Sequence, residues 1–259
     1  MTEKGKFIVF DGLDLIGKGE AERASLSFLE SLGLKVFDQV EFEKSTGKRP
    51  RFGHHPNEEN GIISLGSFDV AYMGEPSYVG AGSDVRFEQI AIRNKGLYDA
   101  RETLSGYDFN RLVHFKRCVV PVRTAGKHII KSRSFASSWC YQGLQAEQEG
   151  RPITEEEFFS YPGNRVAREN PPDLLVIPTI GDVGELEKRL KGRTEKRDDA
   201  IFENLAFLAP LKPHYESEGL RRMFESLGTK VVYIDAGISV EETRRQAVEA
   251  VRPFFIQIP

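Results

Sequence analysis

The sequence has few cysteines and no long apolar run, and each shortage excludes a class of protein. Its 259 residues include two cysteines, Cys118 and Cys140, which are too few for a disulfide framework and have no metal-ligand spacing. No stretch approaches the roughly 18 uninterrupted apolar residues of a membrane span, and no hydrophobic secretory segment precedes the first apolar run. We therefore expect reduced thiols, a cytoplasmic location, no export and no membrane contact.

The sequence also lacks an excess of charge of either sign. Lysine and arginine total 36, aspartate and glutamate total 39, and the formal net charge is −3. This balance gives no general attraction to a polyanion, so long nucleic acid is not an expected partner. Apolar residues make up 39% of the chain and charged residues 29%, which suits a globular protein with a substantial core. We predict a single domain over residues 1–259.

The most informative segment is a glycine-rich turn between an apolar run and an amphipathic stretch. Residues 7–10 are all apolar and predict a buried strand, and residues 20–32 place their apolar side chains mostly on one helical face. Between them, Gly12, Gly17 and Lys18 have the GxxxxGK spacing of a P-loop. In such a loop backbone N–H groups, the positive end of a helix and the lysine all face phosphate. The segment predicts an ATP or GTP site, although a plain glycine turn between a core strand and a helix has the same spelling.

Further short apolar runs alternate with helix-compatible segments along the chain. They occupy residues 36–37, 70–73, 128–131, 174–177 and 231–234. This alternation predicts an α/β fold of the three-layer P-loop type, in which helices flank a mostly parallel sheet. Ligands of such sheets bind beyond the carboxyl ends of the strands. The candidate site positions are therefore residues 12–18, 74–77, 132–134 and 235–237.

Residues 41–68 are polar and rich in charge and glycine, without a clear periodicity. We interpret them as an inserted, mobile loop. Its basic side chains are suited either to contact phosphate or to be solvated, and they are Lys44, Lys48, Arg49 and Arg51. The adjacent His54 and His55 lack the spaced partners of a metal site, which favours solvated side chains over metal ligands.

A second charged stretch follows a predicted helix, and we interpret residues 190–200 as a lid. A closing lid would bring Arg193 and Arg197 to a phosphoryl group in transfer, where positive charge lowers the barrier. The alternative interpretation is an exposed helical turn with charges of both signs.

In their order and separations, the motifs resemble those of the thymidylate kinases. They are FDGLD at 10–14 with the glycine loop, GEP at 74–76, Arg111 and His114 ahead of Pro121, SRSFASSWCYQG at 132–143, PDLLVI at 172–177 and VVYIDA at 231–236. The resemblance covers most of the chain outside the insertion. It implies a nucleoside monophosphate kinase that uses ATP and Mg²⁺, acts on a pyrimidine deoxynucleotide, most simply converting dTMP to dTDP, and forms a homodimer.

The resemblance also implies roles for residues on the donor side. The loop that would bind ATP comprises Gly12, Leu13, Asp14, Leu15, Ile16, Gly17, Lys18, Gly19 and Glu20. Lys18 would hold the donor phosphates, Arg133 would bridge donor and acceptor, and Arg193 or Arg197 would close over the transfer. Glu75 would orient water bound to magnesium, which makes it the candidate metal residue.

On the acceptor side the resemblance implies a nucleoside clamp. Tyr107 would stack on the base, Arg111 would face a base carbonyl, and Ser138, with Gln142 of the YQG motif, would complete the acceptor site. Tyr141 would crowd the ribose 2′ position, and Asp14 would contact the sugar 3′-hydroxyl. Taken singly, the two tyrosines also suit a core, and Asp14 also suits a helix cap.

The departures from the family pattern gather on the phosphate side. Position 19 is glycine instead of a hydroxyl residue, Glu20 brings negative charge to the loop, and Leu15 replaces a glycine. Gly74 stands for an arginine and Ser132 for an aspartate, with Lys131 and the basic insertion as candidates for compensation. Two alternatives therefore stay open: a nucleotide-binding, kinase-like protein with weak or no catalysis and a regulatory role, and a kinase for a modified nucleotide.

Overall fold

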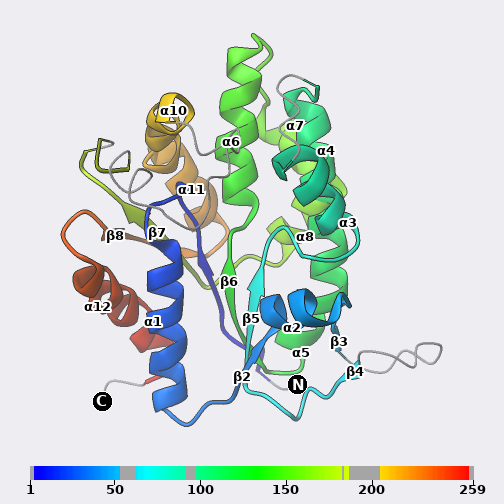
Figure 1. Cartoon of the computed structure of the whole chain (residues 1–259), viewed down its shortest axis with the longest axis vertical. Coiled ribbons are helices and arrows are strands. Elements are labelled where there is room, and N and C mark those ends of the chain that lie inside the picture. The colour runs from blue at the N-terminus through cyan, green and yellow to red at the C-terminus, as the bar shows by residue number, and fades with distance from the viewer. Residues whose placement is uncertain (1–2, 53–61, 92–96, 183, 187–204, 257–259) are drawn as a thin grey trace.

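The computed structural model describes residues 3–52, 62–91, 97–182, 184–186 and 205–256. A six-stranded sheet in the order β2-β5-β6-β1-β7-β8 occupies its centre, and all neighbouring strands run parallel (Figure 1). Its strands are β1 (Phe7–Phe10), β2 (Val36–Asp38), β5 (Val70–Gly74), β6 (His128–Ser132), β7 (Leu174–Thr179) and β8 (Lys230–Asp235). Two short strands, β3 (Arg51–Phe52) and β4 (Ile62–Ile63), pair separately.

Helices cover both faces of this sheet, so the predicted three-layer α/β P-loop fold is confirmed (Figure 1). The helix pair α1 (Lys18–Ser31) and α12 (Val240–Val251) packs side by side on one face. The remaining helical segments are α2 (Gln39–Thr46), α3 (Ala81–Asp84), η1 (Val85–Ala91), α4 (Ala100–His114), η2 (Phe115–Val119), α5 (Val120–Thr124), α6 (Phe135–Gln148), α7 (Glu155–Ser160), α8 (Pro162–Glu169), α10 (Leu205–Tyr215), α11 (Glu218–Ser226) and η4 (Arg252–Phe254).

Strand β1 explains why the central strands are continuous apolar runs. Its side chains alternate between two core clusters, Phe7 and Val9 on one face and Ile8 and Phe10 on the other. A strand that is buried on both faces needs an apolar residue at every position. Each of the six predicted apolar runs coincides with a strand of the sheet, and the helix predicted over 20–32 is observed as α1.

The segment predicted as an inserted loop over 41–68 differs at its start, because α2 extends to Thr46. Asp38 begins this helix, since its side chain accepts a hydrogen bond from the N–H of Glu41 at 2.8 Å. Gly47, at a φ of 64°, ends it. His54 and His55, and the predicted lid at 190–200, lie outside the described residues.

No helix in the described part of the chain is long and apolar enough to cross a membrane.

Candidate functional site

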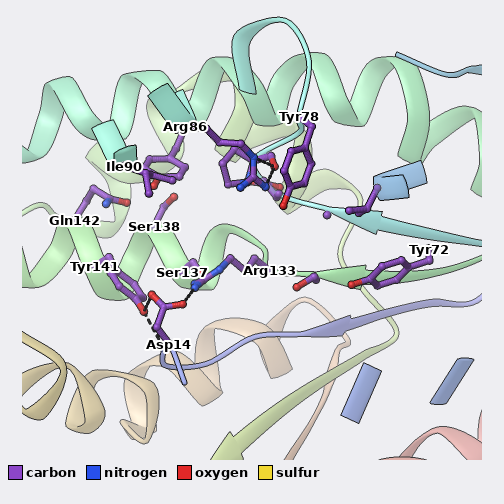
Figure 2. A pocket seen from close by; sticks show the side chains of 16 residues that line it. Asp14, Tyr72, Tyr78, Arg86, Ile90, Arg133, Ser137, Ser138, Tyr141 and Gln142 are labelled. Atoms are coloured by element: carbon purple, nitrogen blue, oxygen red, sulfur yellow. Dashed lines mark hydrogen bonds and ion pairs between the residues drawn. The ribbon is translucent and has the colours of Figure 1, made fainter. Parts of the chain in front are cut away.

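A pocket with a volume of about 270 Å³ opens beyond the carboxyl ends of β1, β5 and β6 (Figure 2). Asp14 after β1, Glu75 after β5 and Arg133 after β6 are among the residues that line it. Three of the four segments predicted to form the site, 12–18, 74–77 and 132–134, therefore contribute residues to this pocket. The parallel sheet accounts for this, because the carboxyl ends of its strands lie at the same edge. Residues 235–237, at the end of β8, do not line it.

The glycine loop has a backbone suited to an anion. Gly12 and Gly17 have φ values of 149° and 99°, and α1 begins at Lys18, so the N–H groups of its first turn lie at the loop. The Lys18 ammonium donates hydrogen bonds to the carbonyl oxygens of Gly12 at 2.9 Å and Leu13 at 2.6 Å. Burial lowers the pKa of Lys18 to about 8. The loop therefore fits a polyphosphate such as ATP, with its lysine folded back onto the main chain.

Leu15 and Glu20, two departures in this loop, are accommodated differently. Leu15 has a φ of 65°, a left-handed conformation that a residue with a Cβ adopts at a cost. Glu20 forms ion pairs with Arg23 and with Arg244 of α12, the latter at 2.5 Å. Its charge is therefore compensated by two arginines and does not act on the loop as an isolated anion.

Asp11, directly before the loop, fastens the loop to α6. Its buried carboxylate accepts hydrogen bonds from the backbone N–H and hydroxyl of Ser134 at 2.7 and 2.8 Å, and from the hydroxyls of Ser137 and Tyr215 at 2.6 and 3.0 Å. Sequence reasoning gave Asp11 no role, because the partners in Ser134, Ser137 and Tyr215 lie more than a hundred residues away along the chain.

Three predicted site residues meet at the mouth of the loop (Figure 2). Arg133 forms an ion pair with Asp14, and the Tyr141 hydroxyl donates to the other Asp14 oxygen at 3.0 Å. Arg133 also donates to the Ser137 hydroxyl at 2.9 Å and has a φ of 66°. Two residues with side chains, Leu15 and Arg133, thus hold left-handed backbone beside the same site, a pattern that is frequent where function fixes geometry.

Glu75 lies between two cations beneath the pocket. One carboxylate oxygen pairs with Arg111 at 2.6 Å and the other with Lys131 at 2.5 Å, and these three side chains are at most 2% exposed. Lys131 also donates to the carbonyl oxygen of Arg133 at 2.6 Å. Burial alone would raise the pKa of Glu75, but Arg111 and Lys131 outweigh it and lower that pKa to about 2.

This arrangement bears on two predicted roles. A water-orienting role for Glu75 stays a prediction, because both of its carboxylate oxygens are paired with cations of the protein. Arg111 is directed inward, to Glu75, to the Ser138 hydroxyl at 2.8 Å and to Asn164, and it is not among the residues that line the pocket.

The described residues do not fit a protein cage for Mg²⁺. Position 19 has no side chain, and the residue at the end of β6 is Ser132, whose hydroxyl carries no charge. Within the described ranges, no group of three or more histidine, cysteine, aspartate or glutamate side chains could hold a metal ion.

Arg86 is a site residue that sequence reasoning missed. It lines the pocket, and its guanidinium lies 3.7 Å from the centre of the Tyr78 ring (Figure 2). Its Nε donates to the carbonyl oxygens of Pro76 and Ser77 at 3.1 and 3.2 Å, and its Nη2 donates to Pro76 at 2.5 Å. Its Nη1 has no hydrogen-bond partner among the residues that the structure describes. No motif marks this arginine, because its partners are backbone carbonyls and a ring.

Gly74 lies against the side chain of Val40 in α2, and both residues line the pocket. A Cβ added at position 74 would lie 2.9 Å from a Val40 methyl group, closer than carbon atoms approach. An arginine at this position would therefore require the Val40 side chain, or α2 with it, to shift. The other end of the pocket is formed by Tyr107, Ser138 and Gln142, and burial raises the pKa of Tyr107 to about 12.

Arg193 and Arg197 lie outside the described residues.

Comparison with known proteins finds similarity over nearly the whole chain, both in sequence and in structure. A thymidylate kinase of Nitrosomonas eutropha is 24% identical over an alignment of 259 positions, which covers 98% of this chain and 95% of that protein. The solved structure of thymidylate kinase from Candida albicans matches with a TM-score of 0.59 at 14% identity, over 98% of this chain and 93% of that chain. No protein-family model matches. The structural likeness shows a shared fold.

Proposed function

We propose that this chain, a divergent member of the thymidylate kinase family, is an ATP-dependent nucleoside monophosphate kinase whose preferred acceptor is dTMP. The observation that carries the proposal is the meeting of an anion-binding glycine loop with a pocket that has aromatic walls and two arginines. Phosphoryl transfer depends on positioning and on positive charge more than on covalent chemistry by the protein. These groups supply both requirements.

On the donor side, Lys18 releases the carbonyl oxygens of Gly12 and Leu13 and turns to the outer phosphates of ATP. The N–H groups of the loop and of the first turn of α1 bind the same phosphates. Gly19 and Glu20 leave these backbone donors intact, because every residue except proline has an N–H group.

On the acceptor side, Tyr107, Ser138 and Gln142 form the wall for the nucleoside. Arg86 supports the acceptor phosphate, because its Nη1 is a guanidinium nitrogen of the pocket wall that no hydrogen bond within the described part of the chain occupies. Its stacking on Tyr78 fixes the plane of the guanidinium before a ligand arrives.

In the transfer, an oxygen of the acceptor phosphate attacks the γ-phosphorus of ATP. The new P–O bond forms as the bond from the γ-phosphorus to the β–γ bridging oxygen breaks, and ADP leaves with that electron pair. Arg133 lines the acceptor pocket and pairs with Asp14 of the glycine loop, so it lies at the junction of the two halves. Its fixed positive charge stabilises the charge that develops on the phosphoryl oxygens.

The test is a coupled assay of diphosphate formation from dTMP, dUMP, dCMP, dAMP and dGMP with ATP and Mg²⁺. We expect turnover with dTMP, a loss of about a hundredfold or more in Lys18→Ala, and no change in a matched Lys35→Ala variant, which removes an exposed lysine. Equal product formation by wild type and Lys18→Ala would contradict the proposal.

A second candidate function is nucleotide binding with weak or no catalysis. The observation in its favour is that Lys18, Arg133 and Glu75 are all held by partners within the protein, and that Mg²⁺ finds no protein cage in the described ranges. Calorimetric binding of ATP and dTMP without diphosphate formation would favour this function. A homodimer stays a prediction from the resemblance, and sedimentation would test it.

A further inference from the structure

The inner face of α2 is buried although it is polar. Gln39 and Glu43, one turn apart, are 1% and 2% exposed. The Gln39 side-chain amide donates to one Glu43 oxygen at 2.7 Å and lies 3.1 Å from Nε2 of His114. The other Glu43 oxygen accepts a hydrogen bond from the backbone N–H of Tyr78 at 2.7 Å. Both oxygens of this buried carboxylate are therefore satisfied.

Burying a carboxylate to hold one backbone N–H group costs free energy, because the carboxylate loses its hydration. Burial raises the pKa of Glu43, and its closest hydrogen-bond partners are uncharged. A structural role alone would be served more cheaply by an apolar contact. The role of Glu43 is therefore indicated by the group that it holds, which is the backbone N–H of Tyr78. Tyr78 belongs to the pocket wall.

Tyr78 is the platform on which Arg86 is stacked, at 3.7 Å. The same short segment is held at both sides of Tyr78, since Arg49 donates to the Ser77 hydroxyl at 3.3 Å and to the Val79 carbonyl oxygen at 2.9 Å. Pro76 and Ser77 supply the carbonyl oxygens that bind Arg86 itself. The position of Arg86 therefore depends on residues 76–79. These residues are held by Glu43 of α2 at Tyr78, by Arg49 at Ser77 and Val79, and by Asn110 of α4 at Ser77.

We propose that Glu43 of α2 is a positioning residue that sets the affinity for the acceptor phosphate by fixing Tyr78 and, through it, Arg86. The proposal rests on the proposed function, because it assigns Arg86 to a phosphate monoester. It gives the segment predicted as an insertion a definite purpose, since α2 builds the wall against which the acceptor phosphate lies. Among the described residues, no hydrogen bond joins Tyr107 or Gln142, at the nucleoside end of the pocket, to Arg86 or to the residues that hold it.

The experiment compares calorimetric affinities for thymidine and dTMP, because their ratio isolates the contribution of the phosphate. We expect Glu43→Ala to weaken dTMP binding about tenfold and to leave thymidine binding unchanged. Glu43→Gln restores most of the affinity, because its amide oxygen accepts from Tyr78 and Gln39 reverses its own amide to match. The matched control is Glu41→Ala, which removes an exposed carboxylate from the same helix.

A double-mutant cycle tests the route through Arg86. If Glu43 acts through that residue, Glu43→Ala combined with Arg86→Met binds dTMP no more weakly than Arg86→Met alone. Tyr78→Leu removes the platform without disturbing the buried carboxylate and is expected to reproduce the selective loss, which keeps the test open if Glu43→Ala does not fold.

Three outcomes would overturn the inference: an unchanged ratio in Glu43→Ala and Tyr78→Leu, equal losses for thymidine and dTMP, or additive effects in the cycle. Wild-type protein that binds neither ligand would contradict the acceptor assignment, and hence the proposed function as well.

Discussion

The two halves of the site are held together by different forces. The glycine loop is built from main chain: its lysine binds loop carbonyl oxygens, and the phosphate donors proposed for it are backbone N–H groups. The acceptor side is built from buried charges, with Glu75 between Arg111 and Lys131. A main-chain site tolerates unusual side chains such as Glu20. A site of buried charges does not, because each group removed leaves its partners uncompensated.

The strongest test of this difference is to neutralise one glutamate on each side of the site and compare the losses of stability. Glu75→Gln leaves Arg111 and Lys131 buried without their anion, and we expect it to lower the free energy of unfolding by about 3–5 kcal/mol. Glu20→Gln, on the surface of the loop side, is expected to cost less than about 1 kcal/mol. Urea unfolding of both variants measures the difference, and equal losses would refute the contrast.

The buried acceptor side also predicts sensitivity to acid. Burial lowers the pKa of His114 to about 3, from 6.5 in the unfolded chain. Between these pH values the unfolded chain binds more protons than the folded one, so stability is retained above pH 6.5 and falls as the pH drops. The expected slope is about 1.4 kcal/mol per pH unit.

Unfolding of wild type and His114→Asn between pH 7.5 and about 4.5 tests this slope. Because other groups titrate in both proteins, the quantity to follow is the difference between them. A difference that does not change with pH would mean that folding leaves the pKa of His114 unchanged, which would contradict the prediction.

The smallest effect is expected on the loop side, at Leu15. A left-handed conformation costs a residue with a Cβ about 1 kcal/mol relative to glycine. Leu15→Gly and Leu15→Ala both remove the side chain, but only glycine relieves the strain, so the glycine variant should be the more stable by about 1 kcal/mol. Thermal unfolding of the pair measures this, and an alanine variant of equal or greater stability would show that the loop is unstrained there.

Sequence reasoning predicted the sheet and the glycine loop for physical reasons. Strands buried on both faces are uninterrupted apolar runs, and a phosphate loop needs its glycines and lysine at fixed spacing. Helix α2 gave no such signal, because its buried face carries Gln39 and Glu43 and so lacks an apolar period. The contact of Glu75 with Lys131 arises from strand register, since β5 and β6 pair Gly74 with Ser132 and bring together residues 56 positions apart.

The family resemblance named Asp14, Arg133 and Tyr141 as site residues with separate roles, and the structure brings them together, but the resemblance could not indicate Arg86 or Val40. Arg86 is held by backbone carbonyl oxygens and a ring, and Val40 acts by filling space above Gly74. Both effects depend on three-dimensional packing, which leaves no pattern in the spacing of residue types.

In the glycine loop, the carbonyl oxygens of Gly12 and Leu13 compete with phosphate for the Lys18 ammonium. While the Lys18 ammonium is bound to the carbonyl oxygens of Gly12 and Leu13, it is not available to phosphate. The apparent affinity for a nucleotide is then the intrinsic affinity multiplied by the fraction of molecules in which Lys18 has been released. A change that weakens either carbonyl contact would therefore strengthen nucleotide binding without adding any contact to the nucleotide.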